Sequence, residues 1–121
     1  MKVEQIDFVT IPTLDVKRAV EFYRDVLGLP QSRYTGAEIE TTNVTLSFWN
    51  PEEDGLEFQP NQAGFGLRVD DVAKARQELE SKGVEFLGET VDTGVCHMGF
   101  FKDADGNAVI LHRRYAPRVP R

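Results

Sequence analysis

The sequence is poor in cysteine and has no long apolar run, and each scarcity argues against a class of protein. The single Cys96 cannot form an internal disulfide, which fits a reducing compartment better than secretion. No apolar stretch approaches the roughly 18 residues that a membrane-spanning helix needs. The first residues include Lys2, Glu4 and Asp7, which is not typical of a secretory leader. We therefore expect a cytoplasmic protein that does not contact a membrane.

Basic residues are also outnumbered. The chain has 14 Lys and Arg against 20 Asp and Glu, a formal net charge of −6, which argues against nucleic acid as a partner. The exception is the C-terminal stretch "HRRYAPRVPR", in which Pro117 and Pro120 favour an extended chain. We expect residues 116–121 to form a basic tail that is solvated or contacts another subunit, in preference to an anion site.

The sequence does contain enough apolar residues, 40% of 121, to form the core of a single domain. Near its start, the pattern predicts a strand followed by a helix. The alternating segment "VEQIDFVTI" predicts the strand. Val16, Ala19, Val20, Tyr23 and Leu27 then recur at helical spacing. Asp15 precedes them as an N-cap residue, and Gly28 follows in the position of a left-handed C-cap.

The same pattern returns 56 residues later, with Asp71 in place of Asp15 and Gly83 ending the second helix. Strands are expected after both helices, at 34–42 and 43–50 in the first half and at 84–90, 95–101 and 107–113 in the second. This favours an internal duplication of a βαβββ unit, hence an α+β fold. We place unit one at about 1–60 and unit two at about 61–115, within a single domain over 1–121.

Each helix should cover one face of its own sheet, and the two sheets should curl into a cup that their other faces line. The stretch "FFKDADGNAVILHRR", 100–114, reads as two strands joined by an acidic turn. Because strand side chains alternate, Val109 and Leu111 should pack under the second helix. Ile110 and His112 should then face the cup.

Three segments resemble the vicinal oxygen chelate superfamily, which holds glyoxalase I, extradiol dioxygenases, fosfomycin-resistance enzymes and bleomycin-resistance proteins. They are "DVKRAVEFYRDVLGL" at 15–29, "LRVDDV" at 67–72 and "FFKDADGNAVIL" at 100–111. The resemblance implies a small-molecule cup and a homodimer whose strands complete the pocket.

The resemblance also implies a divalent metal, but the residues depart from that pattern. The superfamily's ligand positions fall on Phe8, on or near Ser47, on Gly64 and on Ile110. Only the Ser47 hydroxyl is even a weak ligand among them. We therefore expect no metal cofactor, and a divalent ion only if these ligand positions are misregistered.

Strand alternation predicts the residues that line the cup and bind the ligand, a mixture of apolar walls and a few polar groups. The alternative for Phe8, Met98, Phe100 and Ile110 is that they fill the cup as core. Trp49 either closes over a planar ligand or anchors a sheet edge, beside an acidic loop that is solvated or favours a cation. The predicted lining comprises Phe8, Thr10, Thr45, Ser47, Trp49, Arg68, Cys96, Met98, Phe100, Ile110 and His112.

Cys96 and His112 are the candidate catalytic pair, because they fall on adjacent strands and an imidazole can activate a thiol. The alternative is that Cys96 is an inert buried residue. His97 should point to the opposite face and have a structural role.

These patterns leave three functions open. The first is metal-independent binding of a small molecule, as in bleomycin-resistance-like sequestration or sensing. The second is a glyoxalase-like lyase or isomerase, or a dioxygenase-type enzyme, acting on a small substrate in the same cup. The third is an accessory interaction domain whose cup is filled.

Overall fold

The structure, a computed structural model, describes residues 1–119. Pro120 and Arg121, the end of the expected basic tail, lie outside the described residues. The chain divides into two compact units. The first comprises 1–61 together with 104–107, and the second comprises 62–103 and the chain from 108 onward. The division after Asn61 lies next to the expected boundary, but the turn Ala104–Asn107 groups with the first unit.

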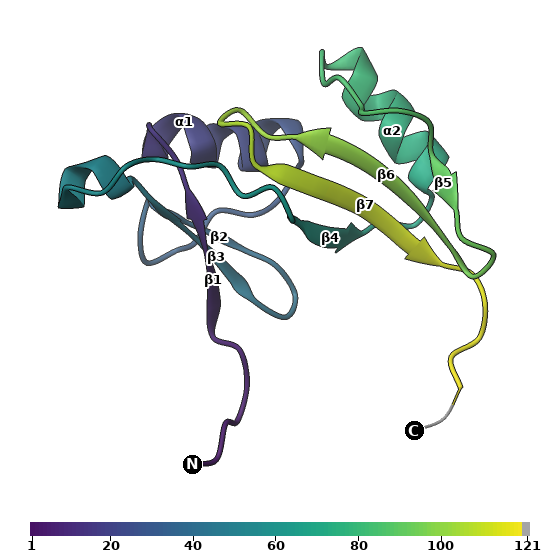
Figure 1. Cartoon of the computed structure of the whole chain (residues 1–121), viewed down its shortest axis with the longest axis horizontal. Coiled ribbons are helices and arrows are strands. Elements are labelled where there is room, and N and C mark those ends of the chain that lie inside the picture. Colours follow the sequence, from purple (N-terminus) through teal and green to yellow (C-terminus); the bar gives the residue numbers. More distant parts are fainter. Residues whose placement is uncertain (120–121) are drawn as a thin grey trace. The chain divides into compact units, whose positions relative to one another are not determined.

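The first unit carries a three-stranded sheet of order β1-β3-β2 (Figure 1). Strand β3 runs parallel to β1 and antiparallel to β2. In place of a further strand, which the βαβββ repeat would add next to β2, there is only a single bridge between Gln31 and Ile39. In chain order the elements are β1 (Phe8–Pro12), α1 (Val16–Glu21), the π-helix η1 (Phe22–Val26), β2 (Glu38–Glu40), β3 (Thr45–Trp49) and the 3-10 helix η2 (Pro51–Asp54).

The first helix begins and ends where its capping residues predict. The Asp15 carboxylate accepts the backbone N–H of Arg18 at 3.1 Å, and Gly28 follows the helix at φ +76°. After Glu21 the helix continues as a π-helix. Its hydrogen bonds there span five residues, as in the bond that the Leu27 amide donates to the Phe22 carbonyl at 3.1 Å. Helical spacing of apolar residues gave no sign of this π turn.

The second unit carries a four-stranded sheet of order β4-β7-β6-β5, with β4 parallel to β7 and the other pairs antiparallel. It therefore shows the complete βαβββ arrangement, of which the first unit is a shorter copy. The strand expected at 84–90 is only a bridge from Phe86 to Phe101, followed by the very short β5. The elements are β4 (Phe65–Arg68), α2 (Val72–Ser81), β5 (Val91–Asp92), β6 (Cys96–Lys102) and β7 (Ala108–Arg114).

Each sheet buries the face that its own helix covers. In the first unit Ile11, Leu46 and Phe48 are buried on that face, and the Tyr23 ring from η1 packs 4.9 Å from the Phe48 ring. In the second unit Val109 and Leu111 are buried in strand β7, which packs against α2. The predicted α+β fold class is confirmed, as is the burial of Val109 and Leu111.

Candidate functional site

The uncovered face of the first sheet, here the first open face, brings together the predicted lining residues of that unit. Register pairs Phe8 with Thr45, Thr10 with Ser47 and Pro12 with Trp49, so these side chains share one face. Phe8 is 59% exposed and Trp49 36% exposed. The first open face therefore presents two accessible aromatic rings beside hydroxyl groups.

Two acidic residues also lie on this face and were not among the predicted lining residues. Strand β2 places Glu38 opposite Ser47 and Glu40 opposite Thr45. The Thr45 hydroxyl donates to Glu40 Oε2 at 2.8 Å. The signal was the triplet "EIE", in which a fully buried Ile39 alternates with two acids, but only the pairing register shows which face the acids occupy.

Trp49 is held by the acidic loop that follows it. Its indole Nε1–H donates to Asp54 Oδ2 at 2.6 Å, and Asp54 ends the short helix η2. One edge of the ring is thus fixed, while about a third of the side chain stays accessible. This geometry is that of an anchored aromatic wall.

The uncovered face of the second sheet, here the second open face, gathers the remaining predicted lining residues. Register pairs Arg68 and Met98 with His112, and Gly66 and Phe100 with Ile110. Arg68 is exposed, and Met98, Phe100, Ile110 and His112 are half-buried. The predicted lining residues thus fall into two groups, one in each unit.

Cys96 lies in β6 directly opposite Arg114, two pairs beyond the Met98–His112 pair. Its Sγ is 3.1 Å from the Thr93 hydroxyl oxygen, and the residue is 8% exposed. The structure therefore gives the thiol a hydroxyl partner from the preceding turn, and the Cys96–His112 catalytic pair stays a prediction.

His97 points away from the second open face, because side chains alternate along a strand and its neighbours Cys96 and Met98 lie on the side of that open face. Its Nε2 lies 3.4 Å from Asp92 Oδ2, and its ring is 4.9 Å from that of Tyr115. Hydrogen bonds from the Gly94 amide and the Tyr115 hydroxyl lower the pKa of Asp92, with a smaller contribution from His97. The same bond to Asp92 raises the pKa of Tyr115.

The residues at the expected metal positions do not fit a divalent ion. Phe8 and Ile110 have no donor atom, and the Ser47 hydroxyl is a weak ligand. At Gly64, φ is +73° and an added Cβ would lie 2.5 Å from the Ala108 carbonyl oxygen, so the backbone leaves no room for a ligating side chain. Within residues 1–119, His, Cys, Asp and Glu side chains nowhere gather in a group of three that suits a metal.

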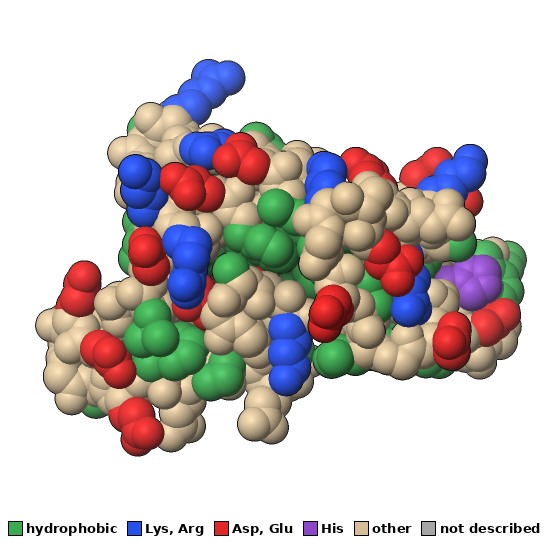
Figure 2. Space-filling view, turned by 90° about the horizontal axis from the view of Figure 1, so that it is seen from above, with side chains coloured by type: hydrophobic (Ala, Val, Ile, Leu, Met, Phe, Trp, Pro, Cys, Tyr) green, Lys and Arg blue, Asp and Glu red, His purple; other side chains and the backbone are tan. Residues whose placement is uncertain are grey.

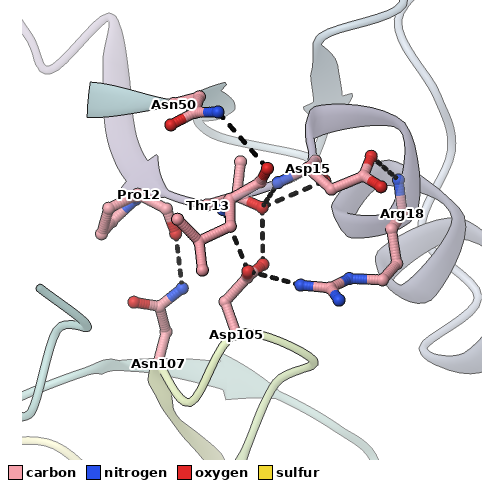
Figure 3. A network of polar contacts seen from close by, with 8 residues as sticks. Pro12, Thr13, Asp15, Arg18, Asn50, Asp105 and Asn107 are labelled. Carbon is pink, nitrogen blue, oxygen red and sulfur yellow. Dashed lines mark hydrogen bonds and ion pairs between the residues drawn. The ribbon is translucent and has the colours of Figure 1, made fainter. Parts of the chain in front are cut away.

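The acidic turn of the predicted hairpin forms a polar network within the first unit (Figure 3). The Asp105 side chain is 1% exposed. It accepts from the Thr13 hydroxyl at 2.6 Å, the Leu14 amide at 3.1 Å and Arg18 Nη2 at 2.7 Å. Asn107 donates to the Pro12 carbonyl at 2.8 Å. These turn residues therefore anchor the end of β1, a role that the sequence did not indicate.

On the face in Figure 2, acidic and basic side chains are interspersed over the molecule. Within the described part of the chain, none of the helices has the length and apolarity needed to cross a bilayer.

Comparison with known proteins identifies the family. Residues 5–111 match the model of the Glyoxalase/Bleomycin resistance protein/Dioxygenase superfamily, and the chain belongs to this family. This confirms the predicted resemblance.

A curated relative is the probable chloroplastic lactoylglutathione lyase of Arabidopsis thaliana. It is 28% identical over an alignment 107 positions long, and the match covers 76% of this chain but only 31% of that protein. The chain thus spans less than a third of the relative's length.

Two solved structures show the same fold. TnmS3, an antibiotic-binding protein from a Streptomyces species, aligns with a TM-score of 0.73 and 22% identity, over 94% of this chain and 98% of that one. A glyoxalase/bleomycin resistance protein/dioxygenase from Nocardioides aligns with a TM-score of 0.74 and 19% identity, over 100% and 90%.

Proposed function

We propose that this chain binds a small organic molecule on the open faces of its sheets and does so without a divalent metal. The observation that carries the proposal is the composition of these faces. Accessible aromatic and aliphatic side chains, such as Phe8 and Phe100, lie beside a few polar groups, such as Thr10 and His112. Small-molecule sites have this composition, in which apolar walls supply affinity and few polar groups fix orientation.

The residues at the expected metal positions support the second half of the proposal. Gly64 sits against the Ala108 carbonyl, and Ile110 offers only a hydrocarbon side chain. The antibiotic-binding protein of the same fold is a precedent for binding as the function. Sequestration or sensing of a ligand is the activity that this chemistry favours.

Homodimer formation belongs to the same proposal. Phe8 is 59% exposed on the first open face, and burial of the exposed part of its ring on association with a second chain would be favourable by about 1–2 kcal/mol. We expect light scattering to give about twice the 13.7 kDa chain mass. A monomer at all concentrations would contradict dimer formation.

A second candidate function is catalysis. The similarity to a probable lactoylglutathione lyase favours it, although the shared region is a minor part of that protein. An assay for lactoylglutathione lyase activity, with and without added divalent ions, tests it. Turnover that requires an ion would replace binding with metal-dependent catalysis.

A thermal-shift screen of small organic molecules against the full chain tests binding. We expect some compounds to raise the melting temperature by several degrees, because a ligand that binds only the folded state stabilises it by mass action. The variant Phe100→Ala should weaken that shift, while Phe22→Ala, outside both open faces, should retain it. If no compound stabilises the protein, the open faces are filled or serve a protein partner.

A further inference from the structure

The side chains of the second open face change from apolar to basic along β7. Ile110, His112 and Arg114 follow one another on the same face of this strand. Ile110 pairs with Phe100 and with Gly66, whose missing side chain leaves the isoleucine uncovered on that side. His112 pairs with Arg68. One end of the face is therefore apolar and the other is basic.

The basic end has no acidic partners in the described chain. None of the ion pairs within residues 1–119 includes Arg68 or Arg114. Asp92, in the edge strand β5 that pairs with β6, lies beside His97 on the opposite face. Within the described residues, the charges of the exposed Arg68 and the half-buried Arg114 are thus not neutralised by an acid.

Arg114 adds an independent observation. Its Nη2 donates to the Pro117 carbonyl at 3.1 Å, which fixes one end of the guanidinium group. Its Nε–H is buried and has no acceptor among residues 1–119. A buried donor without a partner is unfavourable by about 1–3 kcal/mol, and an arriving acceptor would remove that cost.

We propose that the second open face binds a small organic anion, with its oxyanion head against Arg68, His112 and Arg114. The inference rests on the proposed function and names the class of its ligand. Arginine suits this role because its planar group of donors matches a carboxylate or a phosphate. The apolar body of the ligand lies on Met98, Phe100 and Ile110.

The experiment compares three probes with one ring system: 2-naphthoate, 2-naphthyl phosphate and the neutral 2-naphthamide. Calorimetric titration of the full chain should give both anions at least about tenfold tighter binding than the amide, given the strength of charge-assisted hydrogen bonds. The stronger of the two anions identifies the head group as carboxylate or phosphate.

Matched variants locate the site. Arg68→Gln and His112→Gln should each weaken anion binding about tenfold. Arg113→Gln in β7 and His97→Gln in β6 remove the same two types of side chain from the other face of the second sheet and should leave affinity unchanged. A uniform loss in all four variants would overturn the assignment, because net charge alone would then explain binding.

Two further outcomes separate this inference from the proposed function. If 2-naphthamide binds as tightly as the anions, the anion assignment fails and small-molecule binding stands. If none of the probes binds, the assignment also fails. Whether the proposed function survives that result is decided by the thermal-shift screen, which uses other compounds.

Discussion

The Asp105 carboxylate is almost fully buried and accepts hydrogen bonds from Thr13, Leu14 and Arg18. The sequence alone indicated a hairpin turn here, since Asp and Gly favour turns whatever surrounds them. The partners lie about ninety positions away in the chain, and no local pattern encodes such a contact. Turn chemistry was thus predictable at the residue scale, and the anchoring role was not.

Asp105→Ala should lower the free energy of unfolding by about 2 kcal/mol, because it removes the buried acceptor that the Thr13 hydroxyl, the Leu14 amide and Arg18 share. Urea denaturation measures the change. Asp25→Ala, which removes an exposed carboxylate paired with Arg24, serves as the control and should have no measurable effect. Equal stability of the two variants would show that the buried network contributes nothing.

A substitution at Gly64 tests whether the backbone at this expected metal position excludes any side chain. Gly64→Ala should destabilise the protein by about 3 kcal/mol or more, from a left-handed backbone and an overlap with the Ala108 carbonyl together. Gly88→Ala shares the positive φ but meets nothing within 4 Å, and should cost about 1 kcal/mol. If chemical denaturation finds the two equal, the close contact at Gly64 is not a constraint.

Asp92 and Tyr115 give a prediction about titration. The Asp92 carboxylate raises the pKa of Tyr115, so Asp92→Asn should return that pKa toward its ordinary value. Ultraviolet titration of tyrosinate would detect the change, with Tyr115→Phe identifying which of the three tyrosines moves. Because the pKa of Asp92 is itself lowered, its stabilising contacts hold at neutral pH and weaken as pH falls through that lowered pKa.

At the scale of elements, the repeated helix start was predictable because capping is local. Asp15 and Asp71 each accept the backbone N–H three residues on, at 3.1 and 3.0 Å. Less local features were missed. The π turn at Phe22–Val26 and the reduction of the strand expected at 84–90 depend on packing. The face that Glu38 and Glu40 occupy depends on strand register, which three residues do not specify.

Asp71→Ala should destabilise the protein by about 1 kcal/mol through loss of the α2 cap. The neighbouring Asp70 is exposed and makes no cap, so Asp70→Ala is a matched control with little expected effect. Thermal melts of both variants decide the matter. A larger loss from Asp70→Ala would mean that α2 is not capped as described.

At the scale of the whole molecule, sequence and comparisons agree on the superfamily and the fold, while function depends on a few positions within it. From the resemblance, Phe8, a position at or near Ser47, Gly64 and Ile110 are expected to take the places where related enzymes hold a metal, and this expectation was readable from the sequence. The grouping of Ala104–Asn107 with the first unit was not, since their flanking strands belong to the second. Binding without a metal is therefore the central claim about this chain.

The most direct measurement of that claim is ligand stabilisation of the chelated protein. The compound that most raises the melting temperature is titrated into protein freed of metal with EDTA, and again after addition of zinc, manganese or nickel ions. We predict the same affinity in every case, with the ligand bound to protein that contains no divalent ion. Affinity that appears only with an added ion, at one ion per chain, would contradict the claim.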